Sequence, residues 1–300
     1  MEPWIFATLA AATLQTVRFM LQKVLSQTKL STLGATFSRF CFSAPLLWLV
    51  MVVYFASTPE PLPALSLRFW VFASFGGLVQ IIATICVVAL FKSRNFAVGI
   101  TFKKTEVIQA VFVGLVLLGE GVSLVGFAAI LIGLFGVIML SDQKTASNTG
   151  GHRFFNQATG LGLASGFLFA ISAVAYRGAT LEVTMPSPLL TAAVTLLVVI
   201  TFQSVVMAVW IYLRDRPQFR AVWNSRTTAV WVGITSLGGS LGWFTAFALQ
   251  NAAYVKALGQ IEIILSVMVG YFFFKERLAR REVIAMSLLV ISILMLILLT

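Results

Sequence analysis

The sequence predicts an all-helical integral membrane protein with ten transmembrane helices, arranged as two inverted five-helix repeats. Three observations lead to this prediction: an apolar composition, ten apolar runs of spanning length, and a segment that occurs twice. Of the 300 residues, 59% are hydrophobic and 10% are charged, and the mean hydropathy is +0.98. Soluble domains have about 25% charged residues, so this composition excludes a soluble globular protein.

Ten runs are long enough to cross a bilayer, which takes about 20 mostly apolar residues. They are residues 3–24, 31–55, 67–91, 94–118, 121–141, 158–178, 187–213, 226–250, 252–274 and 282–299. Turn-forming residues mark the joints, for example Gly119 and Gly121 between the fourth and fifth runs and Pro186 and Pro188 at the seventh. Each run is therefore expected to be one spanning helix.

A repeated segment divides the chain into two halves. Residues 95–120 and 251–276 align at a constant offset of 156 residues, with identical pairs that include Glu106 and Glu262. Two copies of one apolar unit are typical of secondary transporters. We expect a first repeat over 1–141, a cytoplasmic linker over 142–156 and a second repeat over 157–300.

The Lys and Arg residues of short loops predict the orientation. Fourteen of them fall on one predicted side of the membrane, and only Arg68 and Arg177 fall on the other. The basic side should be cytoplasmic, so both termini should face outward. The net charge of +11 then indicates contact with anionic lipid headgroups rather than with nucleic acid.

Inversion of the second copy follows because five spans are an odd number. The turn after the fourth run, at Glu120, should be external, and it has no basic neighbours. Its counterpart at Glu276 should be cytoplasmic, and it lies among Lys275, Arg277, Arg280 and Arg281. Inverted topology predicts this difference, whereas parallel repeats do not.

Two motifs resemble a known transporter family. They are ALGQIEIILS at 257–266 followed by YFFFKERL at 271–278, and the first-copy equivalent from Lys104 to Glu120. These stretches are similar to the ten-helix drug/metabolite transporters of the EamA family, and within it to amino-acid exporters of the YddG type. Val107 and Ile263 stand where many members carry proline, so a proline kink is not expected.

The resemblance implies a central cavity surrounded by spans one to four and six to nine, with spans five and ten outside. It also implies a secondary transporter that exports amino acids, preferably aromatic and hydrophobic ones, by alternating access. Multidrug transport, or transport of nucleosides or sugar derivatives, is the alternative. The expected partners are an amino acid as substrate and membrane lipid, with no nucleic acid and no cofactor; a monomer is compatible with the sequence.

Charged residues in the fourth and ninth spans are the first candidates for a site. An ionised group at mid-bilayer costs about 2.5–3.5 kcal/mol, so Lys103, Lys104 and Glu106 must pair or line a wet cavity. One interpretation is a structural ion pair between Lys103 and Glu106, three residues apart. In the other, Lys104 or Glu106 meets the substrate. Glu262 could similarly bind an amine or a proton, or simply hydrogen-bond a neighbouring helix.

Arg18 and Arg39 fall in the inner halves of the first two spans. Both are expected to extend to the cytoplasmic headgroups, as long cationic side chains do; carboxylate binding is the alternative. Trp243 follows the glycine-rich stretch 238–242, which could leave room for a flat substrate against the indole ring. Close helix packing at these small residues is the competing explanation.

Polar and aromatic residues at membrane depth complete the candidate set. The predicted substrate-binding residues are Gln15, Gln80, Lys104, Glu106, Trp243, Phe244, Tyr254, Gln260 and Glu262. The sequence carries no nucleophile or phosphate-loop motif. It also has no metal-ligand motif, since Cys41 and Cys86 lie in apolar runs and His152 is the single histidine. We therefore expect neither an enzyme nor a metal site.

Overall fold

The structure, a computed structural model, describes residues 2–28, 30–90, 102–141, 157–265 and 280–299. Within these ranges the chain is all-helical, as predicted, and contains no strand. The helices are α1 (Pro3–Thr28), α2 (Thr32–Cys41), α3 (Ser43–Ser57), α4 (Leu67–Leu90), α6 (Glu106–Leu118), α7 (Leu124–Ser141), α8 (Gln157–Leu181), α9 (Pro188–Arg214), α10 (Pro217–Asn224), α11 (Arg226–Leu249), α12 (Ala252–Leu258) and α14 (Arg280–Leu299).

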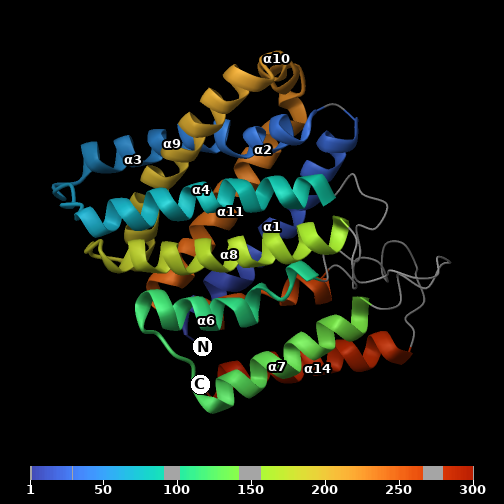
Figure 1. Cartoon of the computed structure of the whole chain (residues 1–300). Coiled ribbons are helices and arrows are strands. Elements are labelled where there is room, and N and C mark those ends of the chain that lie inside the picture. The colour runs from blue at the N-terminus through green and yellow to red at the C-terminus, as the bar shows by residue number, and fades with distance from the viewer. Residues whose placement is uncertain (1, 29, 91–101, 142–156, 266–279, 300) are drawn as a thin grey trace.

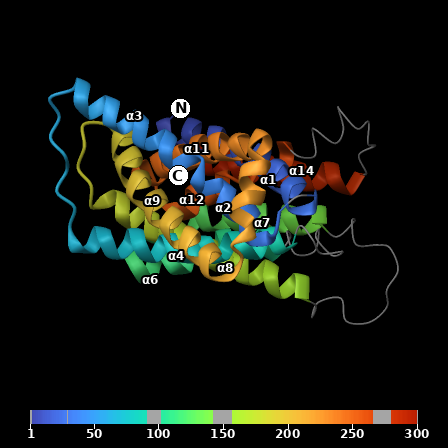
Figure 2. The same ribbon diagram turned by 90° about the horizontal axis from the view of Figure 1, so that it is seen from above.

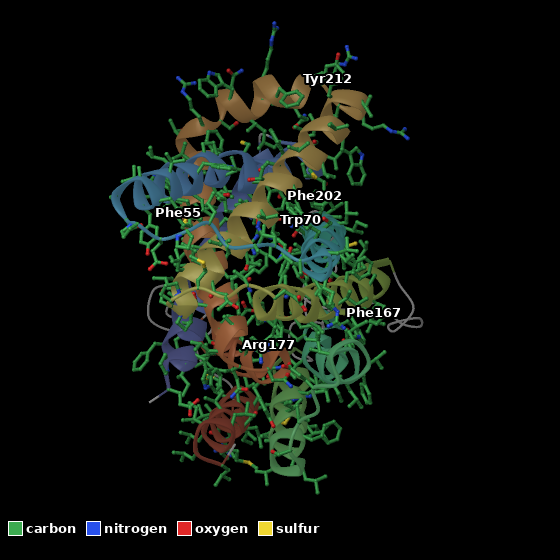
Figure 3. All side chains as sticks on the ribbon, turned by 90° about the vertical axis from the view of Figure 1, so that its left-hand side faces the viewer. Phe55, Trp70, Phe167, Arg177, Phe202 and Tyr212 are labelled. Atoms are coloured by element: carbon green, nitrogen blue, oxygen red, sulfur yellow. The ribbon has the colours of Figure 1, made fainter. Side chains whose placement is uncertain are left out.

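Six described segments are long and apolar enough to cross a membrane, and α6, α7 and α14 are shorter apolar helices. The fourth and ninth predicted spans extend into 91–101 and 266–279, and the predicted linker is 142–156, all outside the described residues. Large apolar side chains cover the outer surface; Trp70 and Phe167, for example, are 47% and 50% exposed (Figure 3). Such a surface suits lipid, so the chain is a membrane protein.

Local sequence explains where the helices begin and end. Ser187 caps α9 by accepting the Leu190 N–H at 3.2 Å, and Pro188 occupies the first turn, where its missing N–H costs nothing. Gly119 ends α6 with a φ of 68°, a left-handed conformation that only glycine adopts readily. These signals agree with the predicted boundaries to within a few residues.

The second predicted span is interrupted between α2 and α3. Pro45 cannot donate a hydrogen bond to the carbonyl of Cys41, one turn earlier. The hydroxyl of Ser43 donates instead to the carbonyl of Arg39 at 2.5 Å, and such side-chain bonds bend helices. The interruption places the end of α2 in the interior of the molecule.

Helix α10 was not anticipated from the sequence, which predicted only a basic loop there. Pro217 opens it, and Gln218 accepts the Ser31 N–H at 2.9 Å. The ring of Phe219 meets Phe37 edge-on at 5.6 Å. These contacts with α2 hold a short helix that its own sequence could not stabilise.

The helices form one bundle with two distinct edges. Figure 1 shows α4, α8 and α6 side by side across the molecule, with α7 and α14 paired at one edge and α9 and α10 at the other. Behind them, α1 packs along α11. The two termini lie in the same region in both views (Figures 1 and 2).

Candidate substrate cavity

A polar cavity lies inside the bundle, between helices from both halves of the chain. Its lining residues are Gln15, Arg39, Gln80, Phe169, Ser172, Ala173, Tyr176, Ser240, Trp243, Phe244, Phe247 and Lys256. They come from α1, α2 and α4 in the first half and from α8, α11 and α12 in the second. The cavity volume is about 20 Å³, room for on the order of one water molecule. A solute of amino-acid size requires the helices to separate.

Arg39 is the cation that projects into this cavity from the end of α2. Its side chain donates from Nε to Ser236 Oγ at 3.0 Å and from Nη1 to Thr84 Oγ1 at 3.1 Å. Its Nη2 makes longer contacts, 3.4 Å to Gln80 Oε1 and 3.5 Å to Ser240 Oγ. All four partners are neutral, and within the described ranges Arg39 has no carboxylate partner.

The expectation that Arg18 and Arg39 extend to the headgroups is wrong, because both are buried, 3% and 6% exposed. Arg18 donates from Nη1 to Gln22 Oε1 at 2.8 Å and lies 4.3 Å over the ring of Phe19. Other helices pack against α1 and α2 at this depth. Each guanidinium therefore bonds with polar groups inside the protein and does not extend to the headgroups.

Gln80, on α4, is the centre of a hydrogen-bond network at the cavity wall. Its Oε1 accepts from the Tyr176 hydroxyl at 3.0 Å and from Gln203 Nε2 at 3.0 Å. Gln203 also donates to the carbonyl of Gly77 at 3.0 Å. The network fixes the orientation of the Gln80 amide, so that its oxygen also faces Arg39.

Helix α8 contributes a cavity face that the sequence analysis missed. Phe169, Ser172, Ala173 and Tyr176 line the cavity, and their spacing of three, four and seven residues places them on one helix face. A polar pair at this spacing inside an apolar span was the available signal.

A cluster of ion pairs lies beside the cavity. Glu106 is ion-paired with two lysines, Lys103 at 3.4 Å and Lys256 at 3.9 Å. Glu262 is ion-paired with Lys104. The structural pairing of Lys103 with Glu106 is therefore present, and Lys104, Glu106 and Glu262 lie behind the described cavity wall rather than on it.

Gln15 links this cluster to the cavity. Its Nε2 donates to Glu262 Oε2 at 3.0 Å, and its Oε1 accepts from Trp243 Nε1 at 3.1 Å. The Lys256 ammonium lies 4.9 Å over the Trp243 ring and 5.7 Å from the Phe169 ring, a favourable cation–π arrangement. Trp243, together with Phe244 and Phe247, forms an aromatic wall.

The glycine stretch before Trp243 serves helix packing, not ligand space. A Cβ added at Gly242 would lie 2.8 Å from the carbonyl oxygen of Ala7, and one at Gly238 would lie 2.8 Å from Leu14 Cδ1. Helix α1 thus fills the space beside these glycines, where the sequence predicted room for a substrate. Close approach at small residues is the usual reason for such a stretch in membrane helices.

Two predicted residues lie away from the cavity. The Tyr254 hydroxyl accepts the Ser123 N–H at 2.8 Å, where α12 meets the start of α7. Gln260 is buried, and its amide oxygen would lie 3.0 Å from a Cβ added at Gly133 of α7. Neither belongs to the described lining, and the contacts of both are with the peripheral helix α7.

Comparison with known proteins supports the fold and no more. No protein-family model matches the chain, and no curated protein matches it. A solved structure described only as "Crystal structure of protein" is similar, with a TM-score of 0.70 and 15% sequence identity. The match covers 98% of this chain and 95% of that chain. The protein therefore shares its fold, over nearly its whole length, with a protein known from crystallography.

Proposed function

We propose that this protein is a secondary transporter of the drug/metabolite transporter superfamily, EamA family, in a bacterial inner membrane. One observation carries the proposal: a lipid-facing helical body contains a central cavity lined by buried cations, amides and aromatic rings. Helices from both halves form the cavity. Buried charge at membrane depth is expensive and usually marks a solute pathway.

The packing is consistent with two inverted five-helix repeats. The offset relates the first and third spans to the sixth and eighth, so the contact of α1 with α11 corresponds to that of α8 with α4. The fifth and tenth spans, α7 and α14, pair with each other, an arrangement that is compatible with a two-fold axis between the repeats. Ten spans with both termini periplasmic and the linker cytoplasmic are part of this proposal.

Alternating access is the proposed mechanism. On the proposed periplasmic side, Arg177 bonds Glu120 at 2.9 Å and donates to the carbonyls of Phe247 at 2.7 Å and Ala248 at 3.0 Å (Figure 3). These bonds tie α8 to α11 and to the turn after α6. Opening the cavity on this side requires them to break.

The proposed substrates are amino acids, aromatic and hydrophobic ones preferred, moved outward. The aromatic wall at Trp243, Phe244 and Phe247 suits an apolar body, and Arg39 suits a carboxylate. Multidrug or other metabolite transport is the alternative, and the lining cations count against cationic drugs. Neither a catalytic reaction nor a cofactor is part of the proposal.

Purified protein in liposomes tests the proposal. We expect saturable counterflow of at least one labelled solute from a panel of amino acids, nucleosides and cationic dyes. Exchange stimulated by unlabelled solute on the opposite side distinguishes a transporter from a channel. Proton exchange and uncoupled diffusion are the two candidate modes; a pH-insensitive rate, unchanged in Glu106→Gln and Glu262→Gln, would exclude proton exchange.

Replacing Trp243 by alanine is expected to lower the transport of aromatic solutes on the order of tenfold, since aromatic contacts contribute about 0.5–1.5 kcal/mol beyond burial. Trp243→Phe keeps an aromatic surface and should lose less. The initial rate of counterflow measures both. Full transport by Trp243→Ala would remove Trp243 from the site.

Replacing Arg177 by glutamine is expected to increase the fraction of molecules in which the cavity is open to the periplasm. The measurement is the labelling rate of Ser240→Cys, in a background lacking Cys41 and Cys86, by a membrane-impermeant maleimide. We expect a rise of several-fold, because the variant loses an ion pair and two bonds to carbonyls.

Arg68→Gln is the matched control for Arg177→Gln. Arg68 is 3.9 Å from Glu182, and its side chain is 82% exposed, so it contributes little. An unchanged labelling rate in Arg177→Gln would contradict the closing role of Arg177.

A further inference from the structure

We infer that the cavity selects an organic anion with an aromatic or apolar body over a zwitterion or a cation. The inference deepens the proposed function and rests on it, in that the cavity is taken as the substrate site. The inferred substrate class differs from the proposed amino-acid substrates in one respect: the preferred solutes carry a carboxylate or similar anionic group but no ammonium group.

The buried charges do not balance. The buried charged residues among those described are the cations Arg18, Arg39, Lys103, Lys104 and Lys256 and the carboxylates Glu106 and Glu262. Five cations against two carboxylates leave an excess of three positive charges. Removing a charge from water without a partner is costly, so the interior favours an anion that arrives from outside.

Both buried carboxylates are already engaged. Glu106 lies between Lys103 and Lys256, and Glu262 lies between Lys104 and Gln15. Neither belongs to the described lining of the cavity. The ammonium group of an amino acid would therefore find aromatic rings and amide or hydroxyl oxygens there, but no carboxylate.

The cavity wall itself carries two cations, Arg39 and Lys256. The two short hydrogen bonds of Arg39 go to Ser236 and Thr84, which do not line the described cavity. Its long contacts, at 3.4 and 3.5 Å, go to Gln80 and Ser240, which do. The guanidinium edge that faces the cavity is thus its least satisfied edge, available for an anion.

Lys256 supplies the second positive charge. Its distance to Glu106 is 3.9 Å, at the limit of an ion pair, whereas its ammonium also faces Trp243 at 4.9 Å. An anion held by Arg39 would have the rings of Phe169, Trp243 and Phe244 around its apolar part. This geometry fits an aromatic or apolar organic anion.

Three solutes that share a phenyl ring and a two-carbon chain but differ in charge test the inference. They are 2-phenylethanesulfonate as anion, phenylalanine as zwitterion and phenethyltrimethylammonium as cation. Permanent charge prevents leakage of the two ionic solutes through the bilayer. Affinity is measured from ligand-dependent thermal stabilisation of the whole protein in detergent, and transport from counterflow in liposomes.

Wild-type protein is expected to bind the sulfonate at least about tenfold more tightly than phenylalanine, and the cation most weakly. A free energy equivalent to tenfold is small beside the Coulomb energy of close charges inside a protein. Equal or tighter binding of phenylalanine, or no binding of the sulfonate, overturns the inference.

The variant Ser240→Asp is expected to reverse the preference for the sulfonate over phenylalanine. It places a carboxylate beside Arg39 Nη2, so the affinity for the sulfonate should fall at least about tenfold. The affinity for phenylalanine should rise relative to the affinity for the sulfonate. Ser240→Asn has nearly the same shape without the charge and should retain the wild-type order. The wild-type order in a folded Ser240→Asp variant also overturns the inference.

The transport assay separates this inference from the proposed function. Counterflow of phenylalanine in preference to the sulfonate would leave a transporter and remove the anion preference. Sulfonate binding with the expected charge order, but without counterflow of any of the three solutes or of the wider panel, would leave the anion site and remove the transporter.

Discussion

Arg39→Gln should lower the counterflow of carboxylate-bearing aromatic solutes on the order of hundredfold. Hydrogen bonds to a charged group are worth about 1.5–3 kcal/mol each, and the upper value corresponds to roughly a hundredfold change in affinity. Glutamine is uncharged and does not provide the two parallel donors of the guanidinium. The initial rate of counterflow in liposomes is the measurement.

Two controls isolate the role of Arg39. Arg39→Lys retains the charge without the bidentate geometry, so an intermediate rate is expected. Arg18→Gln removes another buried guanidinium that does not line the described cavity, and it should transport more nearly as the wild type does. Wild-type rates in Arg39→Gln would show that the substrate does not meet this side chain.

Glu262→Gln is expected to destabilise the folded protein by about 3–5 kcal/mol, the usual cost of removing one partner of a buried ion pair. The variant leaves the Lys104 ammonium, 5% exposed, without its carboxylate. The measurement is the free energy of unfolding in mixed micelles.

The double variant Lys104→Met with Glu262→Gln should recover most of that loss, because no unpaired charge then remains at this position. A double-mutant cycle gives the coupling energy between the two side chains. A double variant as unstable as the sum of the two single variants would contradict a pair that stabilises the contact between the fourth and ninth spans.

Hydropathy predicted the long helices well and the interruptions poorly. The run 226–250 became Arg226–Leu249, because spanning length and apolar composition directly determine such helices. The break between α2 and α3 depends on the single residue Pro45, which hardly alters a hydropathy average. Helix α10 depends on contacts with α2, which lies far from it in sequence.

The sequence predicted which residues lie at membrane depth, but not which of their side chains point into the cavity. Trp243 and Phe244, predicted beside a glycine-rich stretch, line the cavity, and so do Gln15 and Gln80, predicted from their depth in the membrane. Tyr254 was chosen in the same way, but it faces α7, because depth does not determine which helix face points inward. The sequence predicts Arg39 at the headgroups because long cationic side chains usually extend there. Its partners Ser236 and Ser240 lie 197 and 201 residues away in sequence, so no local pattern reveals them.

Counterflow in liposomes decides whether the cavity is a transport site, with 2-phenylethanesulfonate, phenylalanine and the wider panel as solutes. We expect saturable uptake of at least one solute, stimulated by the same unlabelled solute on the opposite side and lost in Arg39→Gln. No saturable uptake of any solute, or uptake that exchange does not stimulate, would contradict a transporter with its site in this cavity.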